Sequence, residues 1–171
     1  MKFNHIDGVS VAARFSEEDG KRYRYRLEAI KIDVPSTGET ICLVMQNPSY
    51  ADKTVADRSV KRMEEMIFGN KQPAFKQIRR LIVVNQFALV QTSGFQGNDE
   101  DIGKDNDKEI GKALRESEIV VLGWGASNRF DARKCFIIGL LKQMPGKKIY
   151  KTKVHPSRGS FSNDFIQVFN L

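Results

Sequence analysis

The chain has 171 residues, of which 40% are hydrophobic and 29% are charged, and its formal net charge is +7. This length and composition suit one hydrophobic core, so we expect a single domain over residues 1–171. No apolar run could span a bilayer, and the start "MKFNHIDGVS" lacks the apolar segment of a signal peptide. We therefore expect a cytoplasmic protein with no membrane partner.

The first predicted element is a β-hairpin. The segments "VSVAARF" (9–15) and "RYRYRLEAIKI" (22–32) alternate in polarity and are separated by the turn-forming "SEEDGK". The continuous apolar run "TICLVM" (40–45) follows, and such runs are typical of strands that are buried on both faces. The next segment, "DRSVKRMEEMIF" (57–68), spaces its apolar residues as one face of a helix, which Asp57 or Ser59 could cap.

Strands and helices then alternate along the rest of the chain. The predicted strands are "RLIVVNQFAL" (80–89), "IVVLGWG" (119–125) and "KIYKTKVH" (148–155), and the predicted helices are "DKEIGKALRESE" (107–118) and "ARKCFIIGLLKQM" (132–144). This order predicts an α/β fold: a three-layer sandwich with a central, mostly parallel sheet, extended or flanked by the N-terminal hairpin. In such folds the functional site lies beyond the carboxyl ends of the strands.

The segments that follow four of these strands are rich in polar and turn-forming residues. They read "QNPSYAD" (46–52), "NQFALVQT" (85–92), "GWGASN" (123–128) and "HPSRGS" (155–160). Asn-Pro, Gly and Pro-Ser are also ordinary loop residues, so any one segment could be a plain turn. Their gathering at one edge of the sheet favours a site.

The order of these motifs resembles that of the uracil-DNA glycosylase-like superfamily. The matching residues are Gln46-Asn47-Pro48, the run "LIVVN" that ends at Asn85, "VVLGWG" that ends at Gly125, and His155-Pro156-Ser157. Within that superfamily the chain resembles an uncharacterised bacterial and phage family, a domain of unknown function. The segments "ARFS", "YRYRL", "NPSYAD", "VNQFA", "WG" and "HP" carry that resemblance over nearly the whole chain.

The resemblance implies excision of a base that is flipped out of DNA into a pocket. In this reading a neutral His155 donates a hydrogen bond to the leaving base, where negative charge develops. Asn85 would recognise a base edge, and Asn47 would orient the attacking water. The remaining implied site residues are Gln46, Pro48, Ser49, Phe87 and Trp124 around the base, and Ser157, Arg158 and Ser160 toward the DNA. Phe87 and Trp124 could equally be core residues.

Three departures from the superfamily pattern point to an unusual substrate. Asn47 stands where the uracil-specific members have an Asp, although mismatch-specific members also have Asn. Ser49 stands where a Tyr excludes bulky 5-substituents, and Gly159 stands where a Leu wedge fills the vacated stack. We therefore expect a 5-substituted pyrimidine as substrate. Hypermodified phage DNA would supply such bases, which would make the protein a defence enzyme.

Two carboxylates follow the Asn-Pro turn and allow different readings. Asp52 is a candidate general base, and Asp52 and Asp57 with Asp107 could form a metal site in a hydrolase of another kind. Alternatively, Asp57 caps the helix that begins there. Asn106 belongs to the family pattern without an evident role, and we expect His5 to be exposed and without a role.

Basic residues cluster at 21–26, 61–63, 76–80 and 147–153, whereas acidic residues collect at 98–109. This segregation favours one face turned toward the phosphates of DNA. Cys42 and Cys135 lie in apolar runs, are too few for a thiolate-bound metal, and are expected to be buried thiols. We expect a monomer with no cofactor and no metal. The alternative function is a non-catalytic nucleotide- or nucleic-acid-binding module of the same fold.

Overall fold

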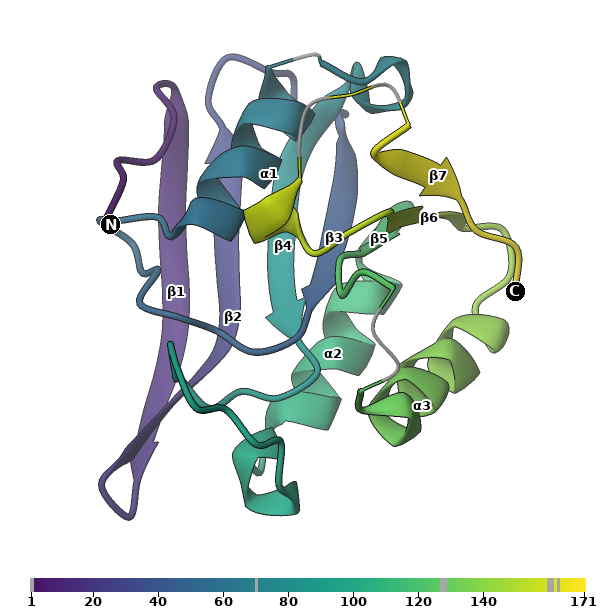
Figure 1. Ribbon diagram of the computed structural model, residues 1–171. Helices are drawn as coiled ribbons and strands as arrows, with labels where there is room; N and C mark the ends of the chain where they lie inside the picture. The colour runs from purple at the N-terminus through teal and green to yellow at the C-terminus, as the bar shows by residue number, and fades with distance from the viewer. Residues whose placement is uncertain (1, 70, 127–128, 160–161, 163) are drawn as a thin grey trace.

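One seven-stranded sheet, with strand order β1-β2-β4-β3-β5-β6-β7, organises the chain in the computed structural model (Figure 1). The structure describes residues 2–69, 71–126, 129–159, 162 and 164–171. The strands are β1 (Val9–Glu18), β2 (Lys21–Lys31), β3 (Glu39–Met45), β4 (Ile78–Asn85), β5 (Ile119–Leu122), β6 (Lys148–Thr152) and β7 (Ile166–Val168). The helices are α1 (Arg58–Phe68), α2 (Asn106–Arg115) and α3 (Asp131–Lys142), with short 3-10 helices η1 (Pro73–Phe75), η2 (Asp99–Ile102) and η3 (Pro156–Arg158).

The centre of the sheet is parallel, as the sequence predicts. β3 pairs in parallel with β4 on one side and with β5 on the other, and β5 pairs in parallel with β6. The hairpin β1–β2 joins the sheet through an antiparallel pairing of β2 with β4, and β7 closes the opposite edge antiparallel to β6. The fold is therefore mixed α/β, with the four predicted core strands in one sheet.

Helices lie on both faces of this sheet (Figure 1). Successive residues of a strand point to opposite faces, so Leu43 packs with Met63 of α1 in one apolar cluster, whereas Val44 packs with Leu114 of α2 and Leu141 of α3 in the other. The predicted apolar face of residues 57–68 is confirmed, because its members are all buried in the first cluster, namely Val60, Met63, Met66 and Ile67.

The two cysteines differ in their surroundings. Cys42 is buried in β3, as expected, but the prediction for Cys135 is wrong because its side chain is exposed on α3. Ile137 and Leu141 form the buried face of that helix, and Cys135 precedes Ile137 by two positions, about 200° around the helix axis. Among the described residues, no helix has the length and apolar character needed to cross a membrane.

A glycine allows the exits of β5 and β6 to approach each other. Gly125 has φ +72°, a backbone conformation that side chains disfavour, and a Cβ atom placed there would lie 2.7 Å from the backbone nitrogen of His155. The "GWG" sequence therefore positions the His-Pro-Ser loop against the end of β5. This contact brings His155 toward the carboxyl edge of the parallel strands.

Candidate functional site

A pocket of about 440 Å3 opens where the loops after β3, β4 and β6 meet the start of α1. Six of the predicted site residues line it: Gln46, Asn47, Ser49, His155, Ser157 and Arg158. Further lining residues that the sequence did not single out are Tyr50, Arg58, Gln91 and Thr92. The predicted position of the site, beyond the carboxyl ends of the strands, agrees with the position of this pocket.

His155 is held as a neutral imidazole with its proton on Nε2. The backbone N–H of Ser157 donates to His155 Nδ1 at 3.3 Å, and the Ser157 hydroxyl lies 3.0 Å from the same nitrogen. Because a backbone N–H can only donate, Nδ1 is unprotonated and Nε2 carries the hydrogen of the neutral ring. Burial lowers the pKa of His155, and the positive charge of Arg158 lowers it further, against the opposing effect of Asp57.

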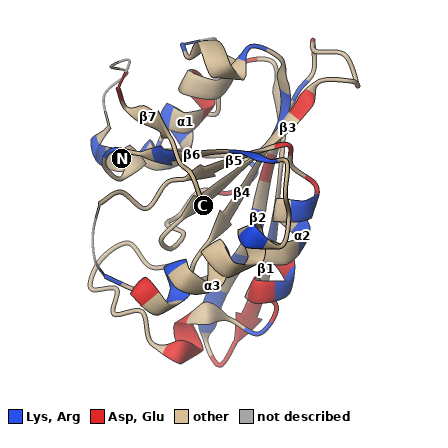
Figure 2. Cartoon of the chain, turned by 90° about the vertical axis from the view of Figure 1, so that its right-hand side faces the viewer, with Lys and Arg blue, Asp and Glu red and all other residues tan. Residues whose placement is uncertain are grey.

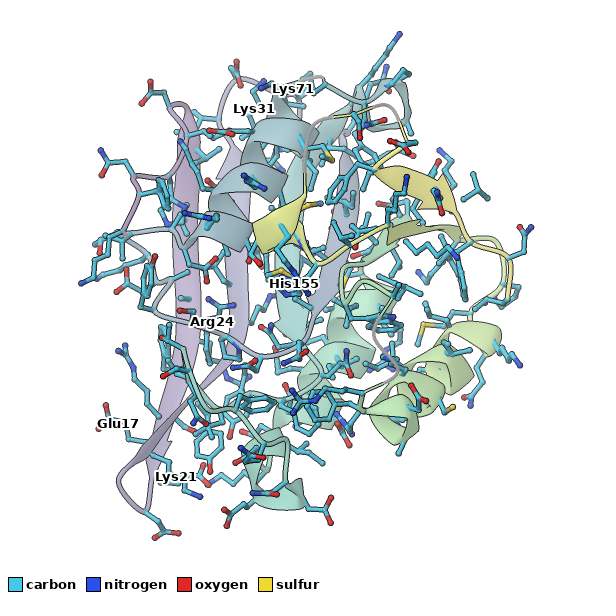
Figure 3. The ribbon with its side chains drawn as sticks, viewed as in Figure 1. Glu17, Lys21, Arg24, Lys31, Lys71 and His155 are labelled. Atoms are coloured by element: carbon cyan, nitrogen blue, oxygen red, sulfur yellow. The ribbon has the colours of Figure 1, made fainter. Side chains whose placement is uncertain are left out.

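The Nε2 atom of His155 has no hydrogen-bond partner among the described residues, so it is available to a ligand in the pocket. Figure 3 shows the His155 side chain below α1, toward the carboxyl ends of β3 and β4. A neutral donor with a fixed tautomer at this place can bind a carbonyl oxygen or an anion that forms during a reaction.

Asp57 is the only carboxylate among the described residues that line the pocket. The predicted cap is present, because one carboxylate oxygen accepts a hydrogen bond from the backbone N–H of Val60 at 2.9 Å. The side chain is 7% exposed, and its second oxygen has no hydrogen-bond donor among the described residues. Asp57 therefore caps α1 and also lines the pocket that His155 lines.

Asn47 fastens the loop after β3 to the loop after β4. Its Nδ2 atom donates to the carbonyl of Gln91 at 2.7 Å and to that of Pro48 at 3.3 Å, while its Oδ1 atom accepts from Gln46 at 3.4 Å. The hydroxyl groups of Ser49 and Thr92 lie 3.2 Å apart between the same two loops. The donors of the Asn47 amide are thus occupied, and its oxygen is the atom left to face water or a ligand.

Asp52 shapes a turn and does not line the pocket. One of its carboxylate oxygens accepts from the backbone N–H of Thr54 at 2.8 Å, from the Thr54 hydroxyl at 2.8 Å and from the backbone N–H of Val55 at 3.1 Å. The bond from the Thr54 backbone is the largest of the effects that lower the pKa of Asp52. The described residues contain no group of three or more His, Cys, Asp or Glu that could hold a metal, so Asp52, Asp57 and Asp107 do not form one site.

Other predicted site residues lie away from the pocket wall. Asn85 is fully buried, and its Oδ1 atom accepts from Arg24 at 3.1 Å. Phe87 packs in a cluster with Phe95 and Phe130, with ring centroids 5.2 and 4.9 Å apart. The remaining two are Pro48, whose carbonyl accepts from Gln91, and Trp124, which packs against the core beside α2 and α3. Ser160 and Phe161 lie outside the described residues.

Asn106 and Asp107 both make contacts that join elements of the fold. The Nδ2 atom of Asn106 donates to the backbone carbonyls of Asn85 and Gln86 at 3.0 and 3.1 Å, which fixes the end of β4 to the start of α2. Asp107 forms an ion pair with Arg133, which joins α2 to α3. Gly159, at the expected wedge position, is buried against the ring of Phe165 and cannot carry a side chain into a base stack.

Arg24 is a buried cation that sequence reasoning missed. Its side chain is 0% exposed and donates to the carbonyl of Ala51 at 3.0 Å and to Asn85, and burial lowers its pKa to about 10. In Figure 3 it extends from β2 into the region below α1 that also contains His155. The sequence carries no signal for this, because the alternation of "RYRYR" gives Arg22, Arg24 and Arg26 equivalent positions.

His5 is not exposed, so that expectation was wrong. Only 9% of its side chain is accessible; Nδ1 lies 2.5 Å from a carboxylate oxygen of the fully buried Glu64, and Nε2 lies 2.8 Å from the carbonyl of Asp52. The Asp52 carbonyl can only accept, and an ionised Glu64 also accepts, so this pair of partners favours the doubly protonated ring. Burial opposes this charge, but the bonds to Glu64 and Asp52 outweigh it and raise the pKa of His5.

Residues 24–158 match the family described as "Protein of unknown function (DUF1643)", and the chain belongs to that family. No curated protein shows significant similarity to the sequence. A solved structure of the feruloyl esterase module from Clostridium thermocellum, a mutant complexed with sinapinate, is 6% identical with a TM-score of 0.35. That similarity covers 87% of this chain and 68% of the esterase module, and it is too low to support an argument about fold or function.

Proposed function

We propose that the pocket accepts a nucleobase flipped out of DNA and that the protein hydrolyses the N-glycosidic bond of that nucleotide. The observation that carries this proposal is the fixed tautomer of His155, whose Nε2–H is free to donate in a pocket that also contains the Asp57 carboxylate. The resemblance of the strand-end motifs to uracil-DNA glycosylase-like proteins supports the same chemistry. The proposed roles of the side chains follow from their hydrogen bonds.

In the proposed reaction the bond between C1′ of the sugar and the base nitrogen breaks, and its electron pair stays on the base. The charge reaches a carbonyl oxygen of the base, where a hydrogen bond from His155 Nε2 stabilises it. The sugar becomes positively charged and lies against Asp57. A water oxygen then bonds to C1′, one water proton passes to the free oxygen of Asp57, and solvent protonates the departing base.

In this proposal the general base is Asp57, in place of the Asp52 that the sequence suggested. Asp52 has one oxygen occupied by three hydrogen bonds within its own turn, whereas Asp57 lines the pocket with an oxygen that lacks a donor among the described residues. Asn47 keeps its proposed role of holding the water, but only through Oδ1, because both Nδ2 contacts are to backbone carbonyls.

The proposed substrate is a pyrimidine with a bulky 5-substituent, such as a hypermodified base of phage DNA, and the proposed role is defence. The small side chain of Ser49 lines the pocket and leaves space that a Tyr at this position would fill. The pocket volume of about 440 Å3 falls within the range of small-molecule sites.

A second candidate, a module that binds a base or nucleotide without cleaving it, is favoured by one observation. The Asn47 amide, which replaces a carboxylate of the uracil-specific proteins, has both of its donor contacts within the protein scaffold. A module of this kind would need the pocket but not the free carboxylate of Asp57.

The two candidates differ in their products. We would incubate the protein with DNAs that contain uracil, mismatches or 5-substituted cytosines, then add hot alkali, which breaks the strand at abasic sites. Excision predicts strand breaks that persist in EDTA and that fall about a hundredfold in rate for His155→Ala, as for removal of one donor to a developing anion. Binding without any break, at every substrate tested, would refute excision and support the binding module.

A further inference from the structure

We propose that a groove along α1 binds the phosphate backbone of the single strand that flanks the base in the pocket; this deepens the function proposed above and rests on it. The groove has a volume of about 360 Å3 and is lined by Phe3, Arg58, Lys61, Arg62 and Glu65. Three cations face one carboxylate there, so the net charge of the lining is +2. We call these five residues the α1 groove.

The α1 groove and the pocket adjoin each other at Arg58, which lines both of them. A strand whose base occupies the pocket would therefore cross Arg58 as it leaves. Arg58 and Arg62 lie four residues apart on α1, which places their backbones about 6 Å apart along the helix axis. That spacing is close to the distance between neighbouring phosphates of an extended single strand, so the two side chains can contact successive phosphates.

The cations of the α1 groove are largely uncompensated. Arg58 has no ion pair among the described residues, and Lys61 lies 3.8 Å from Glu65, the longer limit of such a contact. Arg62 donates to the backbone carbonyl of Gly159, so it lies beside the loop that carries His155 but keeps its full charge. The phosphate oxygens of a nucleic-acid backbone would provide these cations with negatively charged partners.

Some cations in each of the other three predicted basic clusters are buried or paired with a carboxylate. The cluster at 21–26 includes the buried Arg24 and includes Arg26, which pairs with Glu28 and Glu116. In the cluster at 76–80, Arg80 pairs with Glu116, and in that at 147–153 the pairs are Lys148 with Glu39 and Lys153 with Asp164. Lys61 and Arg62 of the cluster at 61–63 instead share the α1 groove with Arg58, where Glu65 is the one carboxylate among the lining residues.

The charge distribution over the molecule supports the α1 groove as the phosphate-binding surface. In Figure 2, Lys and Arg mark α1 and its surroundings near the N-terminus, whereas many of the Asp and Glu residues lie at the opposite, lower end. The aromatic ring of Phe3 adds an apolar surface to the groove, and aromatic rings beside cations are the combination by which proteins hold single strands.

The test measures binding and needs no chemistry. Fluorescence anisotropy of a labelled single-stranded oligothymidine, titrated with the whole protein between about 50 and 200 mM salt, gives the slope of log K against log salt. The double variant Arg58→Gln/Arg62→Gln should reduce the magnitude of that slope by about 1.4, because each phosphate that a side chain neutralises on a single strand contributes about 0.7. The matched control Lys76→Gln/Lys142→Gln removes the same charge from exposed positions outside the groove and should keep the wild-type slope.

Each result decides the proposal. The proposal that the α1 groove binds phosphates would be overturned by an unchanged slope for the groove variant or by an equal reduction in the control. It would also be overturned if oligoglutamate displaced the oligonucleotide at equal charge concentration. Thermal melting of both double variants checks that they fold. Failure of excision leaves the measured slope unaffected, so the two proposals fail separately.

Discussion

Removal of the His5 side chain tests the buried pair that links the N-terminal segment to α1. In His5→Ala the fully buried Glu64 keeps only the backbone N–H of Ile6, at 3.2 Å, as a hydrogen-bond donor. Leaving one charge of a buried pair without its partner costs about 3 kcal/mol. For a chain of this length, that change corresponds to a fall in Tm of about 6–12 °C.

The pair also predicts a pH dependence with a definite sign. The pKa of His5 is raised above its ordinary value of 6.5, so the folded state holds the proton more tightly than the unfolded state does. The stabilisation is therefore complete below pH 6.5 and disappears as the pH rises through the raised pKa. His5→Ala should lack this contribution and should lose less stability than the wild type between neutral and alkaline pH.

Urea unfolding, followed by the fluorescence of Trp124, the single tryptophan, measures the free energy of unfolding at each pH. Glu65→Gln is the matched control, because Glu65 is the neighbouring carboxylate on α1 but is partly exposed. Equal destabilisation of His5→Ala at pH values below and above the transition would refute the imidazolium, and a destabilisation no larger than that of Glu65→Gln would refute the buried pair.

Three further substitutions have defined outcomes. Gly125→Ala would place a methyl group 2.7 Å from the backbone nitrogen of His155. Thermal melting should therefore show destabilisation of about 1 to 3 kcal/mol, and the excision rate should fall because His155 is displaced. Wild-type stability together with a wild-type excision rate would contradict the close approach. Asp57→Asn keeps a capping acceptor, so unfolding should change by less than about 0.5 kcal/mol while excision stops, and continued excision would exclude Asp57 as the base. Asn106→Ala removes the side-chain donor of the buried Asn85 carbonyl, whereas the Gln86 carbonyl keeps its hydrogen bonds from Arg133, so calorimetry should show destabilisation of about 1 to 3 kcal/mol; an unchanged stability would contradict a stabilising role of the Asn106 amide.

The strands and helices could be predicted because their signals are local. The buried parallel strand β3 reads as one apolar run, and the amphipathic period of α1 repeats over three turns. The polar strand ends predicted a site at the edge of the sheet where the pocket lies, and three of the four segments line that pocket. The pocket and the position of His155 in its wall follow from these two regularities.

The identity of the other wall residues depends on contacts between distant parts of the chain. Asn85 ends its strand as expected, but its amide turns to Arg24, which is 61 positions away in the sequence. His5 owes its charge to Glu64, 59 positions away. A single sequence has no local pattern for either pair, so it assigned Asn85 to base recognition and His5 to the solvent.

The role of Asp57 was left open by the sequence for a different reason. The sequence presented helix capping and a part in the chemistry as alternatives, and a carboxylate has two oxygens that can serve separate purposes. One oxygen of Asp57 caps α1, the other has no donor among the described residues, and the residue lines the pocket, so the two readings are compatible.

The loop of residues 46–57 is held from several directions at once, by His5 at the carbonyl of Asp52, by Arg24 at that of Ala51 and by Asn47 at that of Gln91. A loop with so many fixed points has little conformational entropy left to lose when a ligand enters. Binding to the pocket would then resemble the docking of a rigid receptor, in which affinity is set by the fit of the ligand and by the energy needed to extract it from its own stack. For the flipped base proposed as ligand, a rigid pocket would distinguish bases by how readily each one leaves the nucleic acid, before any contact reads its edge.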